Sequence, residues 1–145
     1  MASTTLHILL VDDNDDDIVL IVEAFAACEQ ACKLTTVRDG VEALDFLRRQ
    51  PPFDDADPAD IVLLDINMPR LDGFGVLDAI GKDPALCDLP VVVLSTSEQH
   101  SDRERAFGLG ARDCLHKPVG FDQLRELVHN FLQQWGGADG VPGQA

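Results

Sequence analysis

The sequence predicts an α/β protein with a single doubly wound sheet of five parallel strands and helices on both of its faces. Short apolar runs alternate with longer amphipathic segments along the whole chain. The short runs are apolar at almost every residue, which is typical of strands that are buried on both faces. With 145 residues, the chain has the length of one domain with one hydrophobic core.

The first strand is predicted at residues 6–11 and the first helix at residues 15–29. The run Ile18–Val22 alone fits a strand as well as a helix, but the length of the segment favours a helix. Three aspartates at its start favour the same assignment, because carboxylates stabilise the positive end of a helix dipole. A second strand follows at residues 33–37 and a second helix at residues 41–49.

Residues 50–60 hold three prolines and four aspartates, which predicts an exposed loop. The third strand, residues 61–65, is apolar up to its last residue, Asp65. The later elements continue the alternation: a helix at 74–81, a strand at 91–94, a helix at about 100–109, a strand at 112–115 and a helix with a clear apolar stripe at 121–135. Residues 136–145 have no such period and are predicted to form a flexible tail after a folded domain at residues 5–135.

Charge and composition exclude several classes of function. The chain has 26 acidic and 11 basic residues, a net charge of −15, and would repel a phosphate backbone, so nucleic-acid binding is not expected. No apolar stretch is long enough for a bilayer and no basic segment opens the chain, which predicts a cytoplasmic protein without membrane contact. The cysteines have no zinc-site spacing and are predicted to be reduced and largely buried: Cys28, Cys32, Cys87 and Cys114.

Polar residues stand at the carboxyl ends of four predicted strands: Asp12 and Asp13 after the first, Asp65 at the end of the third, Ser95 after the fourth and Lys117 after the fifth. In an open parallel sheet, ligands bind beyond these strand ends. Three carboxylates that converge there need a positive partner, either Lys117 or a divalent cation. Oxygen ligands without His or Cys favour Mg²⁺. Each residue alone would fit a helix cap or a turn, but their joint placement favours a site.

Five motifs at these positions resemble the signature of response-regulator receiver domains of two-component systems: Val11-Asp12-Asp13-Asn14, Leu63-Leu64-Asp65-Ile66-Asn67-Met68-Pro69 with Asp72-Gly73, Val93-Leu94-Ser95-Thr96-Ser97, Gly110-Ala111 and His116-Lys117-Pro118. The resemblance covers about residues 5–135 and implies a flavodoxin-like sheet with strand order 2-1-3-4-5. The loop at 50–60 and the Leu-Ser-Thr-Ser run are similar to those of small stand-alone regulators paired with cyanobacterial and bacterial phytochromes.

The resemblance implies a chemical role for the strand-end residues. Asp65 would accept a phosphoryl group from a histidine of a sensor histidine kinase, in a phosphorelay that depends on Mg²⁺. The implied metal ligands are the carboxylates of Asp13 and Asp65, the backbone carbonyl of Asn67 and, mainly through water, Asp12. The phosphotransfer and the later autodephosphorylation would be catalysed by the chain itself, and no other enzymatic activity is predicted.

The resemblance also implies a conformational switch. Lys117 would pair with a phosphoryl oxygen, Ser95 would move to donate a hydrogen bond to it, and Thr96 would offer its backbone amide. The negative charge that phosphorylation adds would bias the loop after the fourth strand, and the surface formed by the helix at 100–109, the strand at 112–115 and the helix at 121–135, between two arrangements. Many receivers carry an aromatic residue three positions before the lysine to report this movement, but here that position holds Cys114, so the readout is left open.

A homodimer is predicted from the same resemblance, through the helix at 100–109, the strand at 112–115 and the helix at 121–135. Four apolar residues would supply surface there, unless they belong to the core: Phe107, Cys114, Leu115 and Phe121. No output domain is recognised in these residues, so an effect is expected to pass through a dimer, a further relay step or another protein.

Two other functions are compatible with some of these features. Haloacid-dehalogenase-type phosphatases also use a strand-end aspartate and Mg²⁺, but they carry Asp-x-Asp at the nucleophile and place their acidic pair after it. Here the motif is Asp65-Ile66-Asn67 and the acidic pair comes first. A binding module that keeps the receiver fold without being phosphorylated typically loses an acidic ligand or the lysine, and this chain retains all of them.

Overall fold

The computed structural model describes residues 6–28, 32–51, 53–55, 58–66, 73–95, 100–118 and 120–135. The five strands are β1 (Leu6–Val11), β2 (Cys32–Val37), β3 (Ile61–Asp65), β4 (Val91–Ser95) and β5 (Asp113–His116). They form one parallel sheet in the order β2-β1-β3-β4-β5, which confirms the predicted fold class and strand order. The helices are α1 (Asp15–Ala26), α2 (Gly40–Leu47), α3 (Gly73–Lys82), α4 (His100–Gly108) and α5 (Phe121–Trp135).

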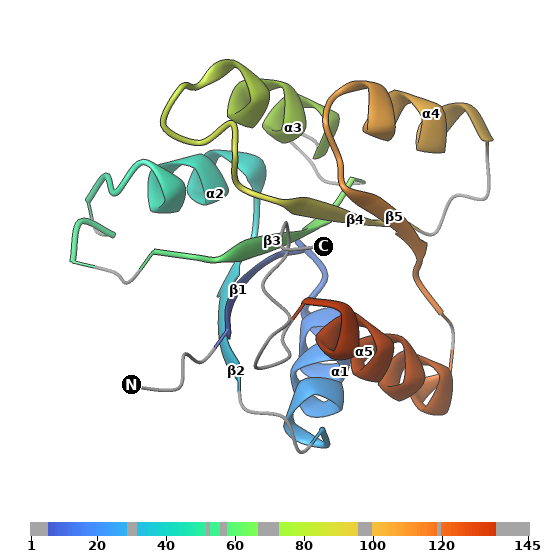
Figure 1. The fold of residues 1–145 in the computed structure, drawn as a ribbon. Coiled ribbons are helices and arrows are strands. Elements are labelled where there is room, and N and C mark those ends of the chain that lie inside the picture. The colour runs from blue at the N-terminus through green and yellow to red at the C-terminus, as the bar shows by residue number, and fades with distance from the viewer. Residues whose placement is uncertain are drawn as a thin grey trace.

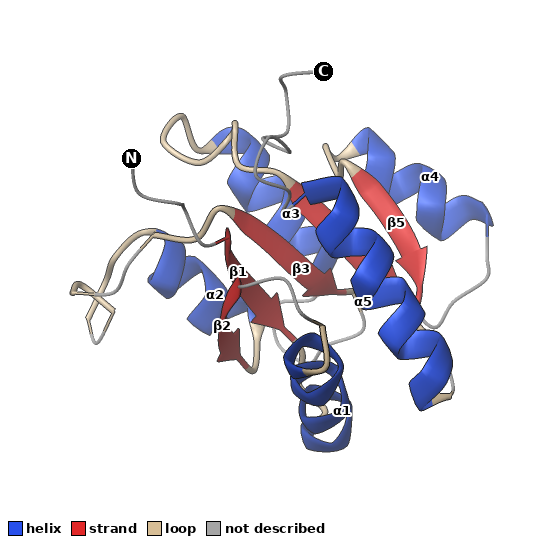
Figure 2. Cartoon of the chain, turned by 60° about the horizontal axis from the view of Figure 1, so that its bottom comes forward, coloured by secondary structure: helices blue, strands red, loops and turns tan. Residues whose placement is uncertain are grey.

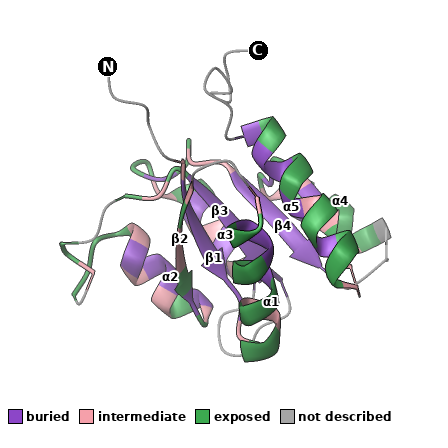
Figure 3. Ribbon diagram, turned by 90° about the horizontal axis from the view of Figure 1, so that it is seen from below, coloured by how far each residue is buried: buried purple, intermediate pink, exposed green. Residues whose placement is uncertain are grey.

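The sheet lies between two layers of helices (Figure 1). Helices α2, α3 and α4 cover one face, and α1 and α5 cover the other, as Figure 2 shows from a second direction. Successive side chains of β1 pack alternately against the two helix layers, because neighbouring residues of a strand point to opposite faces. Leu9 packs toward the first layer and Leu10 toward the second, and both are fully buried. The central strands are therefore buried on both faces (Figure 3), as their continuous apolar runs predicted.

Helix ends differ from the predicted ones. Helix α1 ends at Ala26 rather than at residue 29, because the amide of Cys28 donates to the carbonyl of Phe25 and tightens the last turn. Helix α2 ends at Leu47, since Arg49 adopts a left-handed backbone conformation with φ of 58°. Strand β5 begins and ends one position later than predicted, at Asp113–His116 rather than residues 112–115. The predicted tail at 136–145 lies outside the described residues.

The prediction for the cysteines was wrong in part. All four carry free thiols, but Cys87 is exposed and Cys28 and Cys32 are half-buried. Only Cys114 is buried, at 5% exposure, and it packs in the core beneath α2, α3 and α4. Burial raises the pKa of its thiol. Cys114 therefore belongs to the core, which was the alternative to a place on the predicted dimer surface, and it offers no surface to a partner.

The loop at 50–60 is exposed at most of its described residues and is anchored to the sheet at its end. The amide of His7 donates to a carboxylate oxygen of Asp60 at 2.9 Å, and the amide of Asp60 donates back to the carbonyl of His7. The ring nitrogens of His7 lie 2.8 Å from the Pro58 carbonyl oxygen and 2.8 Å from the Thr35 hydroxyl oxygen. This anchor at the amino edge of the sheet was not predicted. No helix in the described ranges is long and apolar enough to cross a membrane.

Candidate functional site

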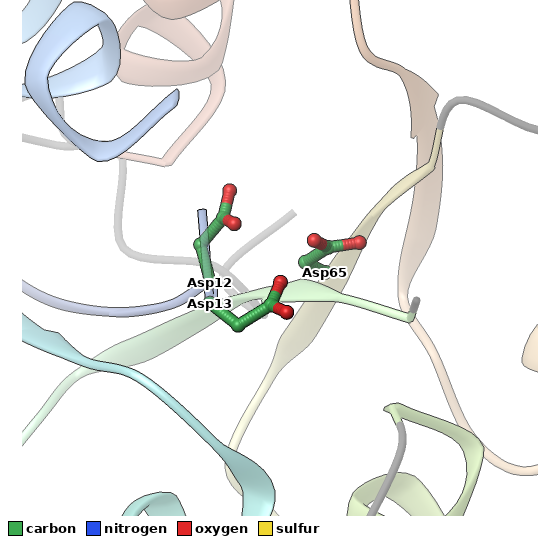
Figure 4. Close-up of side chains that lie close together, drawn as sticks. All are labelled: Asp12, Asp13 and Asp65. Atoms are coloured by element: carbon green, nitrogen blue, oxygen red, sulfur yellow. The ribbon is translucent and has the colours of Figure 1, made fainter. Parts of the chain in front are cut away.

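Three carboxylates gather at the carboxyl edge of the sheet (Figure 4). Asp12 and Asp13 follow β1, and Asp65 ends the adjacent strand β3, so that one oxygen from each lies within 4.8 Å of the others. Asp12 is fully buried and Asp65 is 5% exposed, while Asp13 is half-buried. The structure thus brings together three of the four predicted metal ligands. Buried carboxylates this close repel one another and favour a bound cation.

The backbone after β1 fixes the position of Asp12. Its amide donates to the Val37 carbonyl at 3.1 Å, and its Oδ1 accepts the amide of Asn14 at 2.9 Å. Asn14 is the N-cap of α1, and its side-chain oxygen accepts the amide of Asp17 at 3.0 Å. A short polar residue at this position satisfies a helix amide that would otherwise lack a partner. The start of α1 is therefore tied directly to the buried carboxylate of Asp12.

Gly73 allows α3 to begin against the end of β3. A Cβ atom at this position would lie 2.9 Å from the carbonyl oxygen of Asp65 and closer still to the backbone of Ile66. The amide of Gly73 donates to the Ile66 carbonyl at 3.3 Å. Only glycine permits this approach without displacing backbone atoms. Gly73 thus allows α3 to start directly against the backbone of Asp65 and Ile66.

The ammonium of Lys117 lies among carboxylates in the buried part of the site. Its Nζ lies 2.9 Å from Asp12 Oδ2, 3.0 Å from Asp17 Oδ2 and 3.5 Å from Asp65 Oδ2. The backbone amide of Lys117 donates to the carbonyl of Ser95, which joins the ends of β5 and β4. Burial works to lower the pKa of Lys117, but attraction to Asp65 and Asp12 outweighs it and holds this pKa above its ordinary value. Lys117 is therefore a constant positive charge beside Asp65.

The remaining predicted site residues fall partly outside the described ranges. Ser95 is buried at 3% exposure and ends β4, whose Leu94 pairs in register with Asp65. It stands beside the strand that carries the predicted phosphoryl acceptor. Asn67 and Thr96 lie outside the described residues, so their contacts stay predictions.

Asp17 contacts Lys117, although the sequence indicated only a helix-terminal carboxylate at this position. Its carboxylate is 35% exposed, whereas the side chain of Lys117 is 8% exposed. One signal was available in the sequence. The first turn of a helix that follows a parallel strand starts at the carboxyl edge of the sheet, and three consecutive aspartates occupy that turn.

The donor set fits a hard divalent cation. All three clustered side chains offer carboxylate oxygens, and no His or Cys nitrogen or sulfur joins them among the described residues. Mg²⁺ is bound by few protein carboxylates and keeps several waters, which suits a half-open cluster with Asp13 at its accessible side. Zinc sites, in contrast, are built mainly from Cys and His.

A doubly wound sheet with an aspartate, an acidic pair and a lysine at its carboxyl edge is typical of a protein that handles phosphoryl groups with a divalent cation. The family model for the response regulator receiver domain matches residues 8–129. The chain belongs to this family, which is a family of signalling proteins in two-component systems.

The most similar proteins include regulators associated with phytochromes. The chain is 39% identical to the cyanobacterial phytochrome response regulator RcpA, whose phosphorylated crystal structure matches with a TM-score of 0.85 over 91% of this chain and 94% of that one. It is 33% identical to response regulator Rcp1 of Synechocystis, over 88% of this chain and 87% of Rcp1. A structure of Rcp1 with bound Mn²⁺ matches with a TM-score of 0.82, at 32% identity over 90% of this chain and 94% of that one.

A third relative comes from an archaeon. The chain is 37% identical to the probable methanogenesis regulatory protein FilR2 of Methanothrix harundinacea, over 95% of this chain and 88% of FilR2. The names of these relatives refer to different processes, a phytochrome response for RcpA and the regulation of methanogenesis for FilR2. These matches favour neither a haloacid-dehalogenase-type phosphatase nor a receiver fold that is never phosphorylated.

Proposed function

We propose that this receiver domain accepts a phosphoryl group on Asp65 from a sensor histidine kinase, with Mg²⁺ as the metal. One observation carries the proposal. Asp65, buried at the end of β3, shares a cluster with Asp12 and Asp13 and lies 3.5 Å from the ammonium of Lys117. A carboxylate held between a cation site and a fixed positive charge can attack a phosphoryl group whose negative charge is neutralised from two sides.

The proposed metal ligands are the carboxylates of Asp13 and Asp65, the backbone carbonyl of Asn67 and, through water, Asp12. A bound Mg²⁺ supplies charge neutralisation at the phosphoryl oxygens. The Asp65 oxygen forms a bond to phosphorus as the P–N bond to the kinase histidine breaks, and the imidazole departs with that electron pair. Lys117 pairs with a phosphoryl oxygen and so stabilises the product. The chain itself also catalyses the later loss of the phosphoryl group to water.

Switching is proposed to begin at the end of β4. The Ser95 hydroxyl donates to a phosphoryl oxygen, and Thr96 contributes its backbone amide. Because the amide of Lys117 is bonded to the Ser95 carbonyl at 2.8 Å, a shift of Ser95 moves the end of β5 as well. Arg103 of α4 in turn donates to the Cys114 carbonyl of β5 at 2.7 Å, which offers a route from the site to α4 without an aromatic reporter.

The proposed kinase is a phytochrome or a related sensor, because the chain is similar over 91% of its length to RcpA, a phytochrome response regulator. Helix α1, which starts at the site, exposes three large apolar side chains that a kinase helix could cover: Val19 at 55%, Leu20 at 38% and Val22 at 40%. A surface of this kind next to a reactive carboxylate suits a transient protein partner. We place the protein in the cytoplasm, where such kinases present their histidines.

A homodimer through α4, β5 and α5 is also proposed, on a smaller surface than the sequence indicated. Phe107 of α4 is 43% exposed, and Leu115 of the edge strand β5 is half-buried. Phe121 is 37% exposed and lines a cavity with Leu20 of α1. It therefore lies on the side of α5 that is next to α1. Analytical ultracentrifugation over a dilution series, with and without phosphodonor, tests this; a monomer in both states at high concentration would rule the dimer out.

The test of phosphorylation is intact-mass measurement with a small-molecule phosphodonor, with and without Mg²⁺. The wild-type protein is expected to gain one phosphoryl group only when Mg²⁺ is present. Asp65→Asn should gain none, while Asp88→Asn, which removes an exposed carboxylate before β4, should react as the wild type does. Full labelling of the Asp65 variant would contradict the assignment, and an unreactive wild-type protein would favour a phosphorylation-independent module. A phosphotransfer screen against sensor kinases then identifies the partner.

A further inference from the structure

The three carboxylates around the Lys117 ammonium fall into two groups. Asp12 and Asp65 also belong to the cluster that would hold Mg²⁺, whereas Asp17 does not. The Lys117 ammonium and a bound metal ion would therefore share the carboxylates of Asp12 and Asp65. Among the described residues, Asp17 is the partner that Lys117 does not share with the metal site. Three carboxylates match the three N–H donors of an ammonium.

Asp17 is held at a defined position relative to this cluster. Its amide donates to the N-cap side chain of Asn14 at 3.0 Å, and the amide of Asn14 donates to Asp12 Oδ1 at 2.9 Å. The carboxylate of Asp17 thus projects from the first turn of α1 over Lys117, beside a cavity of about 270 Å³ that Leu20 and Phe121 also line. Its Oδ2 lies closer to the ammonium than Asp65 Oδ2 does, at 3.0 Å against 3.5 Å.

We propose that Asp17 is a positioning residue that, together with Asp12, holds the Lys117 ammonium toward α1 and so leaves the carboxylate of Asp65, 3.5 Å from the ammonium, available to Mg²⁺. Without the Asp17 carboxylate, Asp12 and Asp65 are the partners that remain to the ammonium among the described residues, and it moves closer to Asp65. A divalent cation must then displace a positive charge in order to bind. The inference rests on the proposed Mg²⁺ site and concerns a residue outside that ligand set.

The test is an NMR titration of the metal-free protein with Mg²⁺, followed through backbone amide shifts. Asp17→Asn is expected to weaken Mg²⁺ binding about tenfold, a typical coupling for charged groups in contact. The matched control is Asp16→Asn, which removes the same charge from the same helical turn at an exposed side chain. It should weaken binding by less than about twofold, since exposed charges are well screened. Asp17→Glu, which restores a carboxylate, should recover most of the affinity.

The same substitutions in the Lys117→Met protein distinguish positioning of the ammonium from a simple loss of negative charge. In Lys117→Met there is no ammonium to hold, so Asp17→Asn should cost no more affinity than Asp16→Asn does. Equal effects of the two substitutions in the wild-type background would overturn the proposal, as would a full tenfold loss that persists in Lys117→Met. If Asp17→Asn does not give a folded spectrum, Asp17→Ser is titrated in its place. A wild-type protein that binds no Mg²⁺ would overturn the proposed metal site and this inference together, whereas the other outcomes concern Asp17 alone.

Discussion

The two edges of the sheet bury polar groups in opposite ways. At the carboxyl edge, three carboxylates surround the Lys117 ammonium, with distances of 2.9, 3.0 and 3.5 Å to Asp12, Asp17 and Asp65. Asp13 adds a further negative charge within the same cluster. This edge therefore carries an excess of negative charge in a largely buried setting, which costs free energy until a cation binds.

At the amino edge, the buried ring of His7 meets neutral partners. The carbonyl oxygen of Pro58 can only accept, so Nδ1 donates to it at 2.8 Å, and Nε2 lies 2.8 Å from the Thr35 hydroxyl oxygen. The ring also packs edge-on against Phe46, with 6.0 Å between centroids. Both ring nitrogens of this side chain therefore have a partner.

The contrast between the two edges distinguishes buried polar groups that bind a ligand from those that only stabilise the fold. A group whose hydrogen bonds are satisfied by neutral partners contributes to stability and needs no ligand. A cluster with more negative than positive charge is destabilising by itself, and its retention is explained by binding. On this comparison, substitutions at the carboxyl edge should change metal binding, and those at the amino edge should change stability alone.

The largest effect is expected from Asp13→Ala. The loss of a direct ligand should weaken Mg²⁺ binding and slow phosphorylation by about 10- to 100-fold or more, at least the cost of removing a second-shell group. The free energy of unfolding without metal should not fall, because the deleted carboxylate has like-charged neighbours. Mg²⁺ titration and urea unfolding in chelator measure the two quantities. A less stable metal-free protein would break the comparison.

Gly73→Ala should affect both stability and reactivity. The added Cβ would meet backbone atoms of Asp65 and Ile66, which cannot move aside as a side chain does, so a loss of about 3 kcal/mol is expected from overpacking. Phosphorylation should also slow because Asp65 is displaced. Gly81→Ala is the control: its Cβ would lie 3.6 Å from the Leu109 carbonyl, an ordinary contact, and should leave stability unchanged or higher. Equal behaviour of the two variants in urea unfolding would contradict the steric argument.

His7→Ala should lower stability by about 2 kcal/mol, because two buried hydrogen bonds and the contact with Phe46 are lost. Mg²⁺ affinity should stay at the wild-type value, since the substitution is at the opposite edge of the sheet. Thr35→Val, which removes one of the two ring partners, should cost about half as much. A change in Mg²⁺ affinity in either variant would mean that the two edges are coupled.

The smallest effect on the chemistry is expected from Ser95→Ala. Phosphorylation should proceed within about threefold of the wild-type rate, a barrier change below about 1 kcal/mol, because the hydroxyl is not a metal ligand. The amide shift changes that phosphorylation causes in α4 and β5 should shrink, since the proposed link from the phosphoryl group to β4 is missing. Shift changes as large as in the wild-type protein would exclude Ser95 as the coupling residue.

The elements were predicted well where a pattern is local. Strands β1, β3 and β4 are buried on both faces and therefore form apolar runs, whereas α5 is buried on one face and carries an apolar stripe. Each of these patterns identifies its element in the sequence. Helix ends were predicted less well. The end of α1 depends on the bond between Cys28 and Phe25, and the end of α2 on the backbone of Arg49, neither of which has a signal in the sequence.

The candidate site was predicted for the same reason that the fold was. In a parallel sheet all carboxyl ends lie at one edge, so strand assignment alone brings Asp12, Asp13, Asp65 and Lys117 together. The side of the sheet that Cys114 faces was not predicted, because the strand is short and its pattern is compatible with both faces. The position of Phe121 beside Leu20 of α1 was not predicted either, since the rotation of α5 about its axis is determined by packing.

Sequence patterns indicated the order of strands and helices along the chain, the chemistry of the strand-end residues and the excess of negative charge at one edge. Three contacts became evident only in the folded protein: Asp17 with Lys117, His7 with the loop before β3, and Gly73 with Asp65. These contacts join residues as far apart as the 100 positions between Asp17 and Lys117, and their distances depend on how helices pack on the sheet rather than on any local pattern.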